Sequence, residues 1–124
     1  MEIEFKASAN LEDGLHVGIV DHVENRTDPY EYLDIFIKEN YTGFILKYGC
    51  PNNATEKTKL GKLLLKFKPS IKVSEKVDPE KLLTGKQITF MTVTEKAKDG
   101  NEYCRVVDGS IKPLVTTEKV KNEG

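Results

Sequence analysis

The chain has 124 residues, of which 38% are hydrophobic and 31% charged, so it is long enough for one domain around one core. Nineteen basic and 20 acidic side chains give a formal net charge of -1, which argues against a general polyanion binder but allows a basic stripe on one face. No apolar run reaches the length of a membrane span and no basic-then-apolar signal peptide opens the chain, so the expected compartment is the cytoplasm.

The first predicted strand covers residues 15–24 and follows the turn signal Glu12-Asp13-Gly14. Its alternation of apolar and polar residues slips between Val20 and Val23, close to Gly18. A slip of this kind is typical of a β-bulge, which a small closed barrel needs in order to bend.

The second predicted strand, residues 30–38, has the clearest two-residue period in the chain. Its core face is expected to carry Leu33, Ile35 and Ile37, and its outer face Tyr32, Asp34, Phe36 and Lys38. A phenylalanine on an outer face is hard to explain unless a ligand or another segment covers it.

A third strand is predicted over residues 42–48, as the hairpin partner of the second. Its core face is expected to hold Phe44, Leu46 and Tyr48, and its outer face Ile45 and Lys47. The reversed assignment would exchange the two sets. The run Gly49-Cys50-Pro51 is expected to end the strand.

One helix is predicted over residues 55–67, because Leu60, Leu63, Leu64 and Phe67 have the spacing of one apolar helix face. Thr55 or a neighbouring residue can cap it, and Pro69 ends it. The lysines of its other face are expected to be solvated. The alternative is a basic side patch that a bound strand reaches.

Residues 77–83 suggest one short helical turn, and a fourth strand is predicted over residues 86–96. The run Lys98-Asp99-Gly100-Asn101 indicates a tight hairpin to a fifth strand over residues 102–107. The domain is therefore expected over residues 14–115, between an N-terminal arm of residues 1–13 and a flexible tail of residues 116–124.

The resulting element order is β-β-β-α-β-β. This order predicts an all-β fold with one helix, namely a five-stranded Greek-key barrel of the OB type with the helix between strands 3 and 4. Barrels of this type commonly hold single-stranded nucleic acid or oligosaccharide on one face.

Four motifs cover roughly residues 14–113, namely YEYLDIFI, GCPNNATEKTKLGKLLLKF, VDPEKLLTGKQITFMTV and GNEYCRVVDGSIKP. They resemble motifs of small OB-fold single-stranded DNA-binding proteins of the phage and prokaryotic type. The chain departs from many bacterial single-strand binders in lacking tryptophan and an acidic tip at its C-terminus. The resemblance implies the same barrel and a non-enzymatic role in binding.

Binding a single strand requires rings on which bases stack and cations that follow the phosphates. The candidate residues for these roles are Tyr32, Phe36, Lys38, Lys47, Tyr103 and Arg105. Tyr32 and Phe36 would stack, with Tyr103 as a further ring, and the lysines and Arg105 would contact phosphates. The alternative for the rings is that they pack under the N-terminal arm or the C-terminal tail.

No catalytic motif, nucleotide-binding loop or zinc signature occurs in the sequence, so no enzyme activity, catalytic residue, metal or cofactor is expected. Cys50 and Cys104 belong to no CxxC pair and are expected to be free buried thiols. The expected partner is single-stranded DNA or RNA, with DNA ahead of RNA. The alternative function is an OB-fold protein-interaction or assembly module without nucleic-acid binding, and a homo-oligomer is one form that such a module could take.

Overall fold

The structure is a computed structural model that describes residues 1–4 and 11–115. The predicted tail of residues 116–124 lies outside the described residues, as do residues 5–10 of the predicted arm. The helices and strands in chain order are β1 (Gly14–Arg26), β2 (Tyr32–Glu39), β3 (Ile45–Pro51), α1 (Lys59–Phe67), α2 (Pro79–Leu83), β4 (Gln87–Lys96), β5 (Glu102–Val106) and β6 (Lys112–Pro113).

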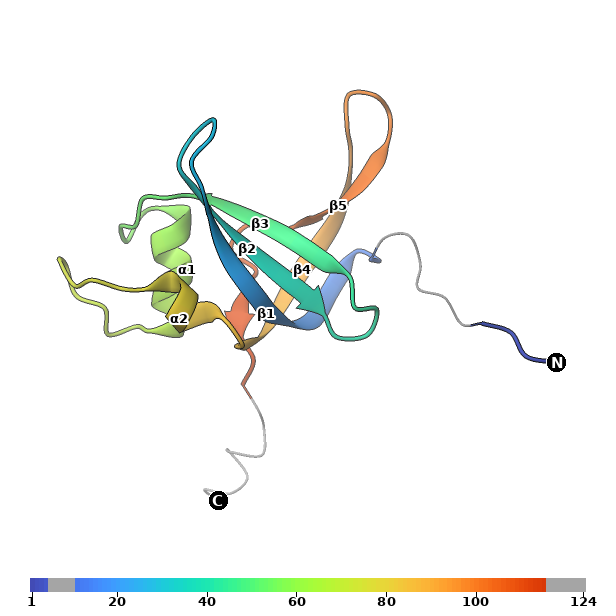
Figure 1. The fold of residues 1–124 in the computed structure, drawn as a ribbon, viewed down its shortest axis with the longest axis horizontal. Coiled ribbons are helices and arrows are strands. Elements are labelled where there is room, and N and C mark those ends of the chain that lie inside the picture. Colours follow the sequence, from blue (N-terminus) through green and yellow to red (C-terminus); the bar gives the residue numbers. More distant parts are fainter. Residues whose placement is uncertain (5–10, 116–124) are drawn as a thin grey trace, which may run out of the picture.

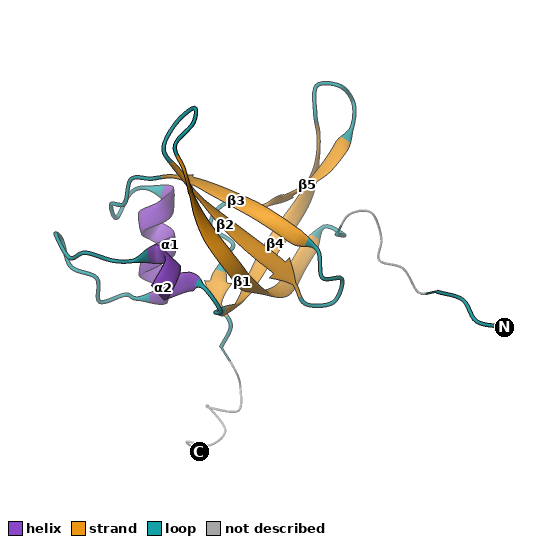
Figure 2. Cartoon of the chain, viewed as in Figure 1, coloured by secondary structure: helices purple, strands orange, loops and turns teal. Residues whose placement is uncertain are grey.

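All strand pairs are antiparallel and form one sheet in the order β3-β2-β1-β4-β5, with β6 also paired to β4. Both helices follow β3 in the chain and lie together at one end of the sheet (Figures 1 and 2). The prediction of a mainly β fold with a helix between the third and fourth strands is confirmed, and α2 accounts for the predicted short helical turn. Among the described strands no hydrogen-bonded ladder joins β3 to β5, although these two strands are in contact.

The long strand β1 lies at the centre of the sheet and pairs with β4 through its first half and with β2 through its second half. The register with β2 shifts between Val20 and His22, as the slipped alternation predicts. Val20 and Val23 therefore both face the core, and Asp21 between them is exposed. The bulge reverses the parity of the strand and turns His22 to the outer face of the sheet.

The core lies between the inner face of the sheet and α1. From the sheet it receives the predicted row Leu33, Ile35 and Ile37, together with Ile88 and Phe90 of β4. From α1 it receives Leu60, Leu63 and Leu64, with Phe67 packed against it, so the predicted apolar helix face is confirmed. Leu11 is also buried, so the packed part of the chain begins before β1.

Strand β3 has the predicted length of seven residues but lies three residues further along the chain, since it begins at Ile45 where the sequence predicts residue 42. It continues through Gly49 and Cys50 to Pro51, because Cys50 fills a core position opposite Leu33 and Gly49 lies opposite the buried Asp34. Of the two assignments of its faces, the first is confirmed, because Tyr48 lies in the core and Ile45 and Lys47 are exposed.

Helix α1 begins later than predicted, at Lys59. Thr58 caps it, since its Oγ1 accepts a hydrogen bond of 3.1 Å from the Gly61 amide. Thr55 instead belongs to a turn before the helix, in which its carbonyl accepts from the Thr58 amide at 3.2 Å. The cap is therefore set by the turn that precedes the helix.

Candidate nucleic-acid interface

The outer face of β2 carries the two rings that the sequence analysis singled out. Tyr32 and Phe36 are half-buried and point away from the core, while Lys38 on the same face is exposed. Across the β2–β3 pairing, Phe36 is the register partner of Lys47 and Lys38 that of Ile45. The structure therefore brings Phe36, Lys38 and Lys47 together on one surface.

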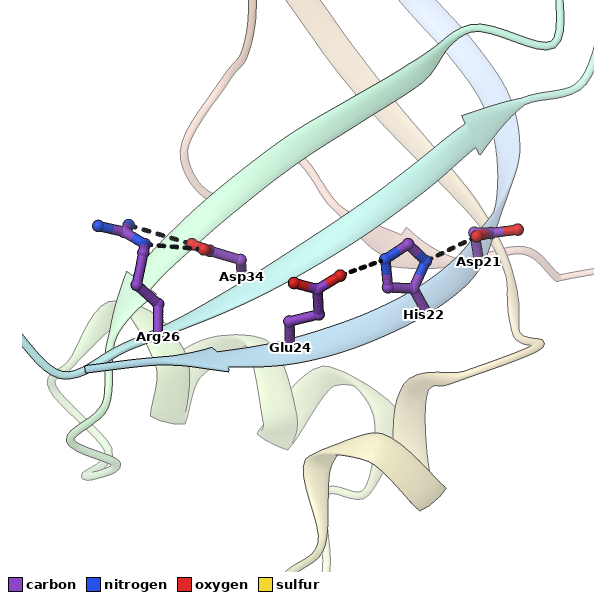
Figure 3. A network of polar contacts seen from close by, with 5 residues as sticks. All are labelled: Asp21, His22, Glu24, Arg26 and Asp34. Carbon is purple, nitrogen blue, oxygen red and sulfur yellow. Dashed lines mark hydrogen bonds and ion pairs between the residues drawn. The ribbon is translucent and has the colours of Figure 1, made fainter. Parts of the chain in front are cut away.

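Phe36 is covered on one side by His22 of β1, which the sequence analysis did not include. The two rings are stacked, with their centroids 4.3 Å apart and an angle of 9° between their planes. His22 lies between two carboxylates, with Nδ1 2.7 Å from Asp21 and Nε2 2.9 Å from Glu24 (Figure 3). The hydrogen bond to Asp21, followed by that to Glu24, raises the pKa of His22, because a ring that donates at both nitrogens is the protonated form.

Tyr32 has a cation over its ring. The Arg26 guanidinium lies 4.7 Å from the ring centroid and also donates to both carboxylate oxygens of Asp34, at 2.8 Å from Nε and 3.2 Å from Nη2. Asp34 is only 4% exposed, and its hydrogen bond with Arg26 lowers its pKa. Figure 3 shows this pair beside the His22 network along β1 and β2.

The sequence contains a signal for these neighbours that the analysis did not use. Once the bulge has reversed the parity of β1, His22, Glu24 and Arg26 alternate on the outer face. The cross-strand partners of these three are Phe36, Asp34 and Tyr32 respectively. A register for the β1–β2 hairpin would have placed His22 and Arg26 opposite the two predicted rings.

The remaining candidates lie on β5, at the other edge of the sheet. Arg105 and Tyr103 both bind Glu95 of β4, with distances to its Oε1 of 2.8 Å from Arg105 Nε and 3.1 Å from the Tyr103 hydroxyl. Glu95 raises the pKa of both partners through these hydrogen bonds. Arg105 thus already has an acidic partner, whereas Lys38 and Lys47 form no ion pair among the described residues.

Contact between the edge strands nevertheless brings Arg105 near Lys47. The two side chains line one hollow of about 320 Å³ between β3 and β5, together with Tyr48, Lys59 and Asp108. The predicted residues therefore form two groups, one on the outer face of β2 and β3 and one on β5. Lys47 and Arg105 connect the groups at the contact of β3 with β5, whereas Tyr103 does not line that hollow.

Two loops flank this surface. The β1–β2 loop (residues 27–31) and the β4–β5 loop (residues 97–101) extend from the same side of the sheet, with β3 running between them in the view of Figure 1. The first loop carries Tyr30, which is 72% exposed. Tyr30 is therefore a loop residue and a further candidate ring, although the sequence predicts it within the second strand.

Within residues 1–4 and 11–115, no three His, Cys, Asp or Glu side chains gather into a group that could hold a metal ion. In the same part of the chain, no helix has the length and apolar character needed to cross a membrane. The thiols of Cys50 and Cys104 are free. Neither the protein-family models nor the curated proteins include a match to this chain.

Proposed function

We propose that this chain is a non-enzymatic OB-type module that binds single-stranded nucleic acid, with DNA as the first ligand to test. The sheet order supports the OB part of the proposal. β1 pairs with both β2 and β4, and the edge strands β3 and β5 touch without a ladder among the described residues, as in a partly open five-stranded barrel. Strands 2 and 3 and the two flanking loops are the usual ligand surface of such barrels.

The observation that carries the proposal is the position of Tyr32 and Phe36. Both rings are on the outer face of β2, beside the exposed Lys38 and Lys47, while the aliphatic residues between them face the core. A base that stacks on such a ring contributes about 1–3 kcal/mol to binding. Two stacked bases and a few phosphate contacts would support micromolar affinity.

The distribution of charge favours one side of the aromatic face for the sugar-phosphate backbone of a bound strand. Asp21 and Glu24 lie on the β1 side of Phe36, and Lys47 lies on its β3 side. Phosphates are repelled by the first pair and attracted by the lysine. The bases would therefore face β2 while the sugar-phosphate backbone runs over β3.

Titration of a fluorescent oligo(dT) at low and moderate salt tests the proposal. We expect binding that weakens as salt rises, and a loss of roughly 30-fold or more in Tyr32→Ala plus Phe36→Ala, because two stacked bases are worth at least about 2 kcal/mol. Tyr41→Ala is the matched control, since this ring is 79% exposed in the β2–β3 loop at the far end of the hairpin. Folded protein that binds no oligonucleotide at either salt would exclude the proposal.

A second candidate function is an assembly module, and exposed apolar side chains on the same outer face support it. Leu15 and Met91 are register partners that are 68% and 44% exposed, and Ile45 is 50% exposed. Light scattering separates the two functions. A dimer that binds no oligonucleotide and dissociates in Phe36→Ala would favour the assembly module.

A further inference from the structure

A second basic surface lies where β3, β5 and α1 meet. We call it the basic seam and define it by Lys47, Lys59, Lys62, Lys66 and Arg105. Helix α1 and the β5–β6 connection enclose a hollow of about 320 Å³ that Tyr48, Lys59, Lys62, Lys66, Asp108 and Gly109 help to line. The neighbouring hollow between β3 and β5 shares Tyr48, Lys59 and Asp108, so the two adjoin.

Three lysines of α1 lie on one side of the helix, where Lys62 is exposed and Lys59 and Lys66 are half-buried. Lys59, Lys62 and Lys66 follow one another at about one per helical turn and all line the same hollow. Lys59 packs its ammonium 4.3 Å from the centroid of the Tyr48 ring and 3.3 Å from Asp108. Its side chain is 32% exposed, so it lies against the fold instead of extending into water.

Positive charge in the seam is incompletely balanced. Asp108 is the one acidic side chain that lines either hollow among the described residues, and it is already paired with Lys59. Lys62 and Lys66 form no ion pair within the described residues, and the Lys66 ammonium donates to the Gly109 carbonyl instead. Partial burial, together with the nearby Lys112, lowers the pKa of Lys66. An anion in the hollow would offset the cost of this burial and the repulsion from Lys112, because an opposite charge favours the charged ammonium.

The seam continues directly from the proposed binding face. Lys47 is the register partner of Phe36 on that face and also lines the hollow between β3 and β5. Beyond Lys47 the hollow leads to Lys59 and from there to Lys62 and Lys66. A backbone that runs over β3, away from Asp21 and Glu24, would enter the seam at Lys47.

We infer that the basic seam is a second phosphate-binding segment, which holds the sugar-phosphate backbone of a single strand after it leaves the aromatic face. This inference rests on the proposed function and extends its site beyond β2 and β3. It makes the length of the bound strand matter. An oligonucleotide just long enough for the aromatic face does not reach α1, whereas a longer one does.

The test compares oligo(dT) of four and of twelve nucleotides on the full chain, with Lys62→Ser plus Lys66→Ser as the variant. Each lost phosphate contact lowers the salt slope by about 0.7, so the double variant should bind the longer strand roughly 25-fold more weakly at 0.1 M salt. Affinity for the short strand should stay unchanged. Lys76→Ser plus Lys81→Ser is the charge-matched control, since both lysines are exposed, one before α2 and one within it, and line neither hollow.

The outcomes separate the seam from the aromatic face. In one outcome, Tyr32→Ala plus Phe36→Ala weakens binding of both strands, while the seam variant binds the longer strand like the unaltered chain and circular dichroism shows that it is folded. In that case the seam inference fails and the proposed function survives. Equal losses in the seam variant and its control also overturn the inference, since they reflect net charge alone. Poly-glutamate serves as a second probe. If the seam variant loses binding to poly-glutamate while its affinity for both oligonucleotides is unchanged, the seam binds an acidic protein segment and the inference is overturned. An unaltered chain that binds neither strand overturns both proposals.

Discussion

Gly61 lies in the first turn of α1, where exchange for alanine would ordinarily stabilise a protein. Glycine inside a helix costs roughly 0.5–1 kcal/mol relative to alanine. Here, however, the turn that precedes the helix lies directly against this position. A Cβ atom on residue 61 would come within 1.7 Å of the Thr55 carbonyl oxygen and 2.6 Å of its carbonyl carbon. We therefore predict that Gly61→Ala destabilises the fold.

The magnitude follows from the contacts that the Thr55 carbonyl makes. This carbonyl accepts from the Thr58 amide at 3.2 Å and from the Thr58 hydroxyl at 3.1 Å, and the same hydroxyl caps α1. Displacing it weakens two hydrogen bonds of about 0.5–1.5 kcal/mol each and strains a packed contact worth about 1–3 kcal/mol. After subtracting the helical gain, we expect a net loss of about 2 kcal/mol.

Thermal denaturation followed by circular dichroism measures this effect. For a chain of this size, a loss of about 2 kcal/mol lowers the Tm by roughly 8 °C. Lys62→Ala is the control on the adjacent exposed position and should change the Tm little, because lysine and alanine are both good helix formers. A Gly61→Ala protein whose Tm rises by several degrees would refute the packing argument.

Three further predictions concern ionisable side chains. Because the pKa of His22 is raised in the folded state, the protonated ring stabilises the fold below the ordinary pKa of 6.5, and this stabilisation is lost as pH rises through the raised pKa. The difference in Tm between the unaltered chain and His22→Gln should therefore shrink as pH rises. A difference independent of pH would contradict the ion pairs. The lowered pKa of Asp34 stabilises the fold above the ordinary value of 3.8, so the Tm difference from Asp34→Asn should be large at pH 7 and narrow on acidification, and a constant difference would count against the Arg26 pair. Burial raises the pKa of the Cys50 thiol to about 11, so a thiol reagent at pH 8 should label Cys104 well before Cys50; equal rates would show that Cys50 is accessible.

The periodic segments of the chain were sufficient to predict which residues enter the core. Along β2, strict alternation separates the aliphatic row that includes Ile35 from the row that includes Phe36, and burial follows this separation except at Asp34, which Arg26 binds. Along α1, the leucine spacing predicts the buried face. Such patterns are readable because a strand alternates every residue and a helix repeats every 3.6 residues, whatever the rest of the fold does.

Ends of elements were less predictable than faces. The sequence analysis ended the third strand at Tyr48, because glycine and proline usually break strands, and it started the helix at residue 55. In the structure Cys50 still pairs with Leu33, and the turn at Thr55 moves the start of α1 to Lys59. A partner on another strand decided the first boundary, and hydrogen bonds within the preceding turn decided the second.

The environment of the candidate site also came from partners. Sequence reasoning placed Tyr32 and Phe36 outside the core but left open what would lie against them. The structure puts Arg26 over the first ring and His22 on the second, and both come from β1 after its bulge. Arg105 was grouped with Lys47 from residue type alone, and the contact of the two edge strands is what brings these side chains to one hollow.

By itself, then, the sequence determined the order of the elements, the inward and outward rows of β2 and β3, and the apolar face of α1. These properties depend on side-chain period along a single segment. Only the tertiary structure decided which charge lies beside each ring, where the acids and the lysines separate, and that α1 and β5 close a basic hollow with β3. Those properties depend on strand register and on packing between segments, which local period does not encode.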